Sequence, residues 1–274
     1  MNLINVDKNK CNKDGLCSLV CPLGLIAIND GNYPAEIAEA GKLCIECGHC
    51  VTICRSGSLQ HSKILGSDCA DIRKELSVSV EQCEQLLRRR RSIRVYQDKP
   101  VPRESLAKLI EIARYAPSGH NSQSAEWLVI DSRVELDRLS GIVVDWMRWM
   151  LDNMKEFAVA MHMDRAVERW EQNCDIILRR APALVIAFAQ KDDRLAPSTC
   201  TIALTYLDLA AASMNLGCCW AGYFNAAATT FPSMMAALAL PTGHQCFGAM
   251  MVGFPKFDHQ RLPPRKPPAI NWRP

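Results

Sequence analysis

The 274-residue sequence lacks several patterns that define common classes of protein. No basic start followed by an apolar core marks a secretory signal, and the most apolar run, residues 181–189, is far shorter than a membrane span. Neither G-x-G-x-x-G after a predicted strand nor G-x4-G-K-[ST] is present, and no Ser–His–Asp or Cys–His catalytic set is credible. A net charge of +3 is too small to indicate nucleic acid or an anionic membrane. We therefore expect a cytoplasmic protein with neither partner.

What the sequence does have is cysteine, 14 residues in all, seven of them between Cys11 and Cys54. In a reducing cytosol such a cluster indicates metal ligands rather than a disulfide framework. The seven scattered cysteines are interpreted as small buried apolar residues; they are Cys69, Cys83, Cys174, Cys200, Cys218, Cys219 and Cys246.

The second cysteine group has the spacing Cys44-x2-Cys47-x2-Cys50-x3-Cys54. Three thiolates on one tight loop fit three corners of an iron–sulfur cubane, and the fourth reaches a neighbouring cluster. Zinc sites usually combine two distant C-x2-C pairs, so the spacing favours iron–sulfur over a zinc module or core cysteines. The first group repeats this frame through Cys11, Cys17 and Cys21, with Asp14 in the place of the second cysteine.

These two groups, CNKDGLCSLVCPLGLI and CIECGHCVTICRSGSL, form a pseudo-repeat that resembles the bacterial two-cluster ferredoxins over about residues 5–60. The resemblance implies two βαβ halves and crossed ligand sets. One set, for a [4Fe-4S] cluster, is Cys21, Cys44, Cys47 and Cys50; the other is Cys11, Cys17 and Cys54 with Asp14 as the fourth ligand. Because carboxylate oxygen holds this iron less tightly than thiolate, the second cluster is either a [4Fe-4S] cluster with an Asp ligand, slightly favoured, or a [3Fe-4S] cluster. His49 is interpreted as a polar loop residue.

The rest of the chain predicts an α+β domain, because its strands and helices do not alternate regularly. Expected helices span 68–87, 104–115, much of 136–180, and an Ala-rich segment, 201–216, suited to deep burial or a subunit interface; expected strands span 127–130, 183–188 and 247–254. We predict a ferredoxin-like (βαβ)2 module over 1–60, a connector over 61–87 and a second domain over 88–274.

The segment RRRSIRVYQDKPVPRESLAKLIEIARYAPSGHNSQ closely resembles the start of the nitroreductase-like flavoproteins, and the resemblance extends over about residues 86–268. It implies an FMN site whose residues come from four segments. Arg90, Arg91, Ser92 and Arg94 would hold the phosphate and ribityl chain; Pro117, Ser118, Gly119, Asn121 and Gln123 would form a second flavin loop supplied across a homodimer interface; the Ala221 N–H would point at flavin N5 beside Gly222; and Arg265 and Lys266 would return to the phosphate. Guanidinium groups suit phosphate because they form charge-assisted hydrogen bonds.

The two resemblances together imply an oxidoreductase that passes electrons from iron–sulfur clusters through FMN to a small organic acceptor. The donor would be an external ferredoxin or NAD(P)H, and no side chain is assigned a catalytic role. Three alternatives remain open: a dehydrogenase that runs in reverse to reduce a ferredoxin, a non-enzymatic electron carrier or flavin sensor, and a zinc module without redox chemistry.

Overall fold

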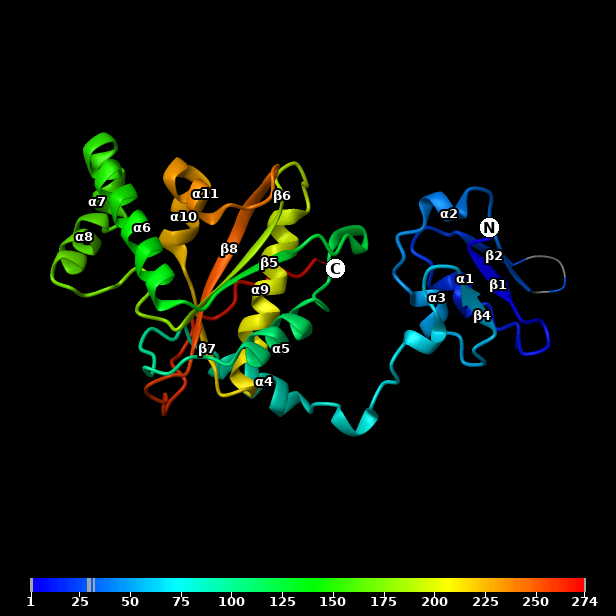
Figure 1. Ribbon diagram of the computed structural model, residues 1–274. Helices are drawn as coiled ribbons and strands as arrows, with labels where there is room; N and C mark the ends of the chain where they lie inside the picture. The colour runs from blue at the N-terminus through cyan, green and yellow to red at the C-terminus, as the bar shows by residue number, and fades with distance from the viewer. Residues whose placement is uncertain (1, 29–30, 32, 274) are drawn as a thin grey trace. The chain divides into compact units, whose positions relative to one another are not determined.

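The computed structural model describes residues 2–28, 31 and 33–273. The chain divides into two compact units (Figure 1). The first unit comprises Met1–Ser77 with Gly119–Ser122, and the second comprises Val78–Ser118 with Gln123–Pro274. Each unit has a hydrophobic core of its own. The main division therefore falls inside the connector predicted over 61–87, and the first compact unit extends past residue 60.

The first unit contains two β-α-β halves. Its strands are β1 (Ile4–Val6), β2 (Ile26–Ile28), β3 (Pro34–Glu36) and β4 (Leu59–His61), and its helices are α1 (Leu16–Leu19), α2 (Ala40–Leu43) and α3 (His49–Thr52). Strand β1 pairs antiparallel with β4, and β2 pairs antiparallel with β3. Buried Leu3, Leu25, Val51 and Leu59 lie in a small core, against which several cysteines pack. The predicted (βαβ)2 arrangement is confirmed.

The helix predicted over 68–87 is wrong in its first half. Only two 3-10 turns, Gly66–Asp68 and Lys74–Leu76, lie there, and helix α4 begins later, at Val80–Arg89. Its start is set by a capping box, in which the Ser79 hydroxyl accepts from the Gln82 N–H and the Gln82 side chain accepts from the Ser79 N–H. Apolar spacing extended the prediction too far because residues 70–78 lie exposed and have no core to pack on.

The second unit is built on one antiparallel sheet in the order β5-β6-β8-β7. These strands are β5 (Glu126–Ile130), β6 (Ala183–Gln190), β7 (Gly217–Trp220) and β8 (His244–Gly253). Strand β6 is buried over seven of its eight residues, which explains its nearly continuous apolar sequence, ALVIAFA. A β-bulge shifts the β6–β8 register between Ala187 and Phe188.

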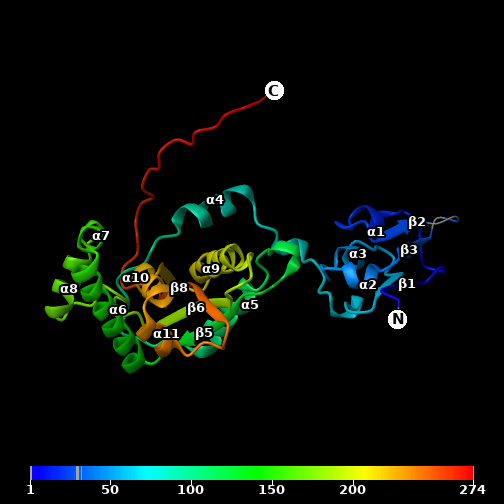
Figure 2. The ribbon, with the colours of Figure 1, turned by 90° about the horizontal axis from the view of Figure 1, so that it is seen from above.

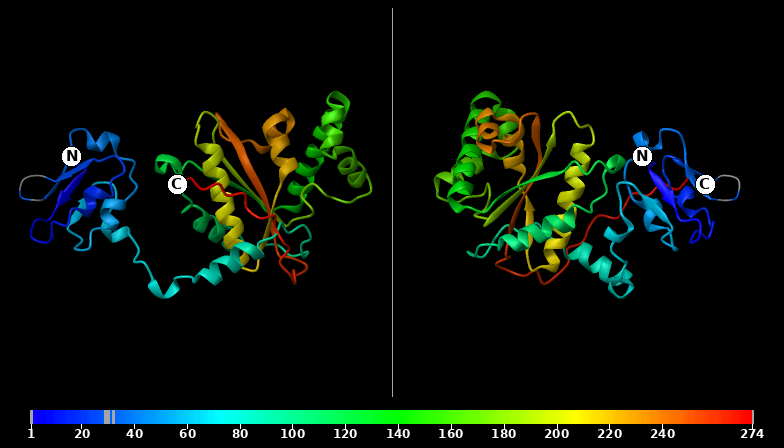
Figure 3. Two further views of the ribbon diagram at one scale, coloured as in Figure 1. Left: turned by 180° about the vertical axis from the view of Figure 1, so that it is seen from behind. Right: turned by 45° about the vertical axis from the view of Figure 1, so that its right-hand side comes forward.

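Helices cover both faces of this sheet, as α9 (Ala196–Ser213, yellow) and α10 (Gly222–Thr230, orange) show on opposite sides of β8 in the left view of Figure 3. Helix α5 (Arg103–Ala113) packs with α9 on one face, and Figure 2 shows α4 lying beside α9. The other face is covered by α6 (Arg133–Asn153), α10 and α11 (Pro232–Leu238), with α7 (Lys155–Ala160) and α8 (Met163–Glu171) packed on α6. Both units are mixed α and β, so the predicted α+β class is confirmed.

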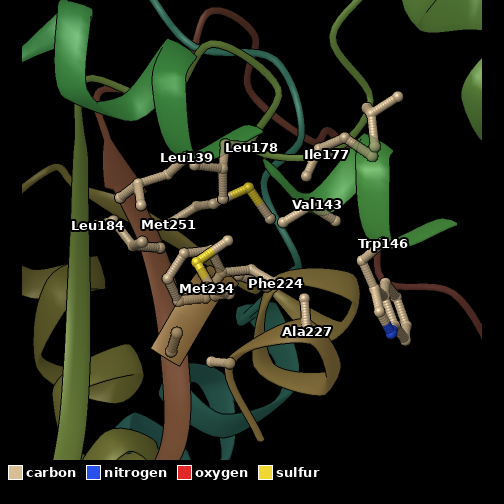
Figure 4. Close-up of a cluster of buried hydrophobic side chains, with 14 of the residues drawn as sticks. Leu139, Val143, Trp146, Ile177, Leu178, Leu184, Phe224, Ala227, Met234 and Met251 are labelled. Atoms are coloured by element: carbon tan, nitrogen blue, oxygen red, sulfur yellow. The ribbon is translucent and has the colours of Figure 1, made fainter. Parts of the chain in front are cut away.

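The larger core lies between the sheet and helices α6, α10 and α11 (Figure 4). Phe224 is its largest fully buried side chain, and Met234 and Met251 lie beside it. Unbranched methionines fill the irregular space between non-parallel helices and a twisted sheet. The helix predicted through much of 136–180 is observed as three helices, α6, α7 and α8. Strand β7 and helices α10 and α11 were not predicted, because such short elements have little periodicity.

The cysteines and the helices bear on disulfide bonding and on membrane insertion. All 14 cysteines lie in the described part of the chain, and each is free rather than in a disulfide. Among the described helices, none combines the length and apolar character needed to cross a bilayer.

Candidate functional site

The first unit contains two cavities lined by cysteine. The one that we call the all-cysteine cavity is lined by Cys21, Cys44, Cys47 and Cys50, together with His49, His61 and apolar side chains from the core. The other, which we call the aspartate cavity, is lined by Cys11, Asp14, Cys17 and Cys54, with Ser58 beside them. The structure thus brings together the same two sets of side chains that the ferredoxin resemblance implies. That these sets bind iron stays a prediction.

Matching backbone conformations in the two halves explain how each set converges. Lys13 and Glu46 both have positive φ, at 59° and 55°, and so do Gly15 and Gly48, at 70° and 73°. Glycine adopts this conformation without steric cost, which permits the turn that starts each short helix. Helices α1 and α3 then carry Cys17 and Cys50 back toward the cavity edge. Asp14 therefore occupies the same local backbone position as Cys47.

Hydrogen-bond donors surround the cysteine sulfurs. The Leu25 N–H donates to Cys21 Sγ at 3.3 Å and the Glu46 N–H donates to Cys44 Sγ at 3.4 Å. Hydroxyl oxygens of Ser58 and Ser56 lie 3.4 and 3.7 Å from Cys54 Sγ. Such donors stabilise negative charge on sulfur, as iron–sulfur ligation requires. The residues present therefore fit a pair of thiolate-bound clusters.

Burial acts against this charge to different degrees. It raises the pKa of the Cys50 thiol to about 11, with the neighbouring Cys47 adding to the effect. Burial also raises the pKa of Cys17. At Cys54 burial has the same sign, but hydrogen bonds led by that of Ser58 outweigh it and lower the pKa. The thiols of Cys50 and Cys17 thus favour the protonated form until a cationic metal compensates the cost of a buried thiolate.

Asp14 has a local role besides lining the aspartate cavity. Its Oδ1 accepts a hydrogen bond from the Leu16 N–H at 3.2 Å, at the beginning of α1. This contact is typical of an Asp near a helix start, whether or not a metal is nearby. A carboxylate has several lone pairs, so this bond leaves capacity for a metal.

The second unit holds a basic cavity of about 710 Å3. Its size falls within the range of about 300–1,000 Å3 common for cofactor sites. Arg89, Arg90 and Arg91, at and just after the end of α4, line it together with Gly217 and Cys218 of β7 and the segment 254–262. Two chain segments meet closely here, because a Cβ on Gly217 would lie 2.3 Å from Ile93. The cavity therefore combines positive charge with a closely packed floor.

Asp208 is a member of the basic cavity that sequence reasoning missed. Its Oδ2 lies 3.2 Å from Nη1 of Arg90, and its side chain is only 7% exposed. Burial raises the pKa of Asp208, and the adjacent Arg90 opposes this effect. A signal was present in the sequence, since Asp208 is the single charged residue of the otherwise uncharged helix α9. The pair holds the Arg90 guanidinium at the cavity wall.

The other predicted flavin residues are only partly gathered at this cavity. Arg90 and Arg91 line it, whereas Ser92 and Arg94 are outside its lining, and Arg94 donates to the Ser92 carbonyl oxygen at 3.4 Å. Arg265 and Lys266 lie exposed in the C-terminal segment, also outside the lining.

The predicted second flavin loop is outside this lining as well. Pro117, Ser118 and Gln123 belong to the second unit, where Ser118 Oγ accepts from the Gln123 N–H at 3.0 Å. Gly119 and Asn121 group with the first unit, in which the Asn121 amide donates to the carbonyl oxygens of Ile45 and Glu46.

The role predicted for the Ala221 N–H needs correction. In the structure this N–H donates to the Ala249 carbonyl oxygen at 2.9 Å, so β8 already occupies it. The next N–H along the chain belongs to Gly222, the first residue of α10, and the first N–H groups of a helix have no intrahelical acceptor. A Cβ on Gly222 would meet nothing within 4 Å, which shows open space beside this residue.

Comparison with known proteins agrees with both resemblances. A model described as "Nitroreductase family" matches residues 87–254, and one described as "4Fe-4S dicluster domain" matches residues 9–59. A relative from Archaeoglobus fulgidus, named as a proposed NADH dehydrogenase/NAD(P)H nitroreductase, is 23% identical over 177 residues, which cover 65% of this chain and 87% of the relative. The dicluster match confirms the iron–sulfur interpretation over the zinc alternative.

Solved structures add a likeness of fold. An FMN-bound nitroreductase from Bacteroides fragilis is 22% identical, with a TM-score of 0.54 over 68% of this chain and 94% of that one. A BluB-like flavoprotein from Clostridium difficile is 21% identical, with a TM-score of 0.55 and the same coverage of both chains. At these identities the likeness shows a shared fold, and the predicted nitroreductase-like fold of the second domain is confirmed.

The contribution of the Arg90–Asp208 ion pair to stability can be tested by mutation. Arg90→Ala leaves a buried carboxylate without its counter-charge, which should lower the free energy of unfolding by about 1–3 kcal/mol at neutral pH. A matched variant, Arg94→Ala, removes an exposed guanidinium and should cost less than about 0.5 kcal/mol. Denaturant unfolding of both variants measures the difference.

The free energy of unfolding that Arg90→Ala loses should depend on pH in a defined direction. Without Arg90 the pKa of Asp208 rises further above its unfolded value, because burial then acts unopposed. Such a group stabilises the fold below the unfolded pKa and loses that contribution as pH rises through the folded pKa. The deficit of Arg90→Ala should therefore shrink as the pH is lowered toward the usual range of Asp. A deficit that is constant or grows on acidification would contradict the assignment.

Proposed function

The chain belongs to the nitroreductase family, and on that premise we propose that it is an FMN-dependent oxidoreductase that passes electrons from two iron–sulfur clusters to a small organic acceptor. The observation that carries the proposal is the presence, in one chain, of two cysteine-lined cavities and a basic cavity lined by Arg90 and Arg91, two of the residues expected to hold FMN. FMN, when bound, can take up electrons singly and give up two, so it links one-electron clusters to a two-electron acceptor.

The basic cavity fits the phosphate end of FMN. Arg90 and Arg91 present guanidinium groups at its wall, and phosphate accepts two hydrogen bonds from such a fork. Asp208 orients Arg90, and its negative charge is already compensated by that arginine. Arg89, which also lines the cavity, adds further positive charge. These residues bind and orient the cofactor.

For the flat end of the same cofactor we propose the open space at Gly222, which is outside the lining of the basic cavity. The absence of a side chain at Gly222 allows a ring to approach the backbone, and the N–H at the start of α10 is a suitable donor to a ring nitrogen. We therefore assign to the Gly222 N–H the role first predicted for Ala221.

In the first unit we propose the all-cysteine cavity as the site of a [4Fe-4S] cluster held by Cys21, Cys44, Cys47 and Cys50. For the aspartate cavity we propose Cys11, Cys17, Cys54 and Asp14 as ligands, either of a [4Fe-4S] cluster or of a [3Fe-4S] cluster that lacks the Asp14 corner. The hydrogen bonds to sulfur described above support both assignments.

The proposed function requires an electron donor and a second copy of the chain. NAD(P)H, named for the Archaeoglobus relative, or an external ferredoxin would supply electrons. A second copy of the chain would complete each flavin site with residues 117–123, which do not line the basic cavity of their own chain. The free cysteines are typical of a protein in a reducing compartment, and we propose a cytoplasmic location.

The function is tested with anaerobically purified protein. It should contain FMN, and iron and acid-labile sulfide sufficient for two clusters per chain. Reduced protein should be reoxidised by a nitroaromatic, a quinone or an enone. Arg91→Ala should raise the dissociation constant for FMN roughly ten- to hundredfold, since a charge-assisted hydrogen bond contributes about 1.5–3 kcal/mol. Arg165→Ala, an exposed arginine of α8, is the control and should leave FMN binding unchanged.

Three outcomes would contradict the proposal. Reduction of an external ferredoxin without reduction of any organic acceptor would favour the reverse dehydrogenase. A protein that holds FMN and clusters but reacts with neither would be a carrier or sensor. A protein without labile sulfide after anaerobic reconstitution would remove the cluster assignment.

The aspartate cavity makes a separate prediction. An iron held by Asp14 should be the most labile, because softer thiolates hold the other corners. Mild oxidation of the parent protein should give the electron paramagnetic resonance signal of a three-iron cluster from one site only. Asp14→Cys should suppress that signal and shift the reduction potential of the same cluster. Identical spectra and potentials in parent and variant would show that Asp14 serves α1 alone, through its bond to Leu16.

A further inference from the structure

A histidine lies inside the all-cysteine cavity and has no place in the ligand set. His61 is the last residue of β4, is only 3% exposed, and pairs across the sheet with Ile4 of β1. Its imidazole lines the cavity together with Cys21, Cys44, Cys47 and Cys50. A buried imidazole at such a position needs hydrogen-bond partners, and the structure supplies one for each ring nitrogen.

The two contacts define which nitrogen carries the proton. The Lys63 N–H donates to His61 Nδ1 at 3.1 Å, so Nδ1 is the unprotonated acceptor of the neutral ring. The proton is then on Nε2, which lies 3.5 Å from Cys44 Sγ. Nε2–H therefore donates to sulfur, because a metal-bound thiolate has no proton to give.

The surrounding contacts hold this geometry in place. Cys44 Sγ also accepts the Glu46 N–H at 3.4 Å, so two donors converge on one sulfur. The Glu46 side chain forms an ion pair with Lys63, which connects the cysteine loop to the segment that follows β4. Pairing with Ile4 thus fixes the backbone of His61, and the hydrogen bond from the Lys63 N–H fixes the orientation of its ring.

We propose that His61 is a positioning residue that donates a hydrogen bond to the Cys44 thiolate and so raises the reduction potential of the cluster in the all-cysteine cavity. This inference rests on the ligand sets of the proposed function. One-electron reduction adds negative charge to the cluster and its sulfurs, and an N–H dipole directed at a sulfur stabilises the reduced form more than the oxidised one. With the His61 hydrogen bond, this cluster is a better electron acceptor than it would be with backbone donors alone.

The test compares three variants by redox titration with dithionite as the reductant, monitored by electron paramagnetic resonance. His61→Leu keeps bulk and removes the donor, and should lower the ratio of reduced to oxidised cluster at a fixed potential on the order of tenfold, about 59 mV for one electron. His61→Gln keeps a side-chain N–H of similar reach and should stay near the parent value. His162→Gln is the matched control, because His162 is exposed and lies outside the lining of both cysteine-lined cavities; it should leave the potential unchanged.

Unchanged potentials in both His61 variants would overturn the proposal, and so would equal losses in His61→Leu and His61→Gln. If His61→Leu fails to hold its cluster, pulsed electron paramagnetic resonance of reduced protein with 15N-labelled histidine decides. A weak nitrogen coupling present in the parent and in His162→Gln but absent in His61→Gln supports the contact, and its absence from the parent refutes it. Iron and sulfide counts on each sample report separately on whether the proposed clusters are present.

Discussion

The constraint on which the first unit depends is the cost of gathering thiolates in a small, partly apolar space. Burial raises the pKa of Cys50 and Cys17, so the metal-free sulfurs resist ionisation. Hydrogen-bond donors directed at the sulfurs oppose this cost of burial. They are N–H or hydroxyl groups of Leu25, Glu46, His61 and Ser58. We therefore expect metal binding and folding to be coupled in this unit. Leu25 and Ser58 directly precede β2 and β4, and His61 ends β4, so these two strands position three of the donors.

The second unit meets the opposite requirement, the recognition of an anion. Four consecutive arginines, residues 88–91, would repel one another, and the last three of them line the basic cavity. Arg90 pairs with buried Asp208, whereas neither Arg89 nor Arg91 forms an ion pair with another described residue. A sheet covered by helices on both faces gives this cavity a rigid floor at β7. One unit thus stabilises negative charge on sulfur, and the other offers positive charge to a phosphate.

Much of this organisation could be predicted from the sequence, for reasons that are local. Cysteine spacing indicated iron–sulfur ligands, and the resemblance to two-cluster ferredoxins supplied the two crossed sets of side chains that line the cavities. Long periodic segments such as α5 and α9 were also found. What escaped prediction depended on contacts distant in sequence: Asp208 meets Arg90 only when α9 folds against the end of α4, and the Ala221 N–H is occupied only because β8 lies beside it. The start of α4 was misplaced because the Ser79 capping box outweighs weak apolar spacing.

The central claim is that electrons held in the clusters reach the acceptor through FMN. The direct measurement is freeze-quench electron paramagnetic resonance after anaerobic mixing of dithionite-reduced protein with a quinone, using FMN-loaded protein and protein depleted of FMN. The account predicts that the reduced-cluster signal decays rapidly in the FMN-loaded protein and persists in the depleted protein. Equal decay in both would show that the clusters reach the acceptor without the flavin, and would contradict the account.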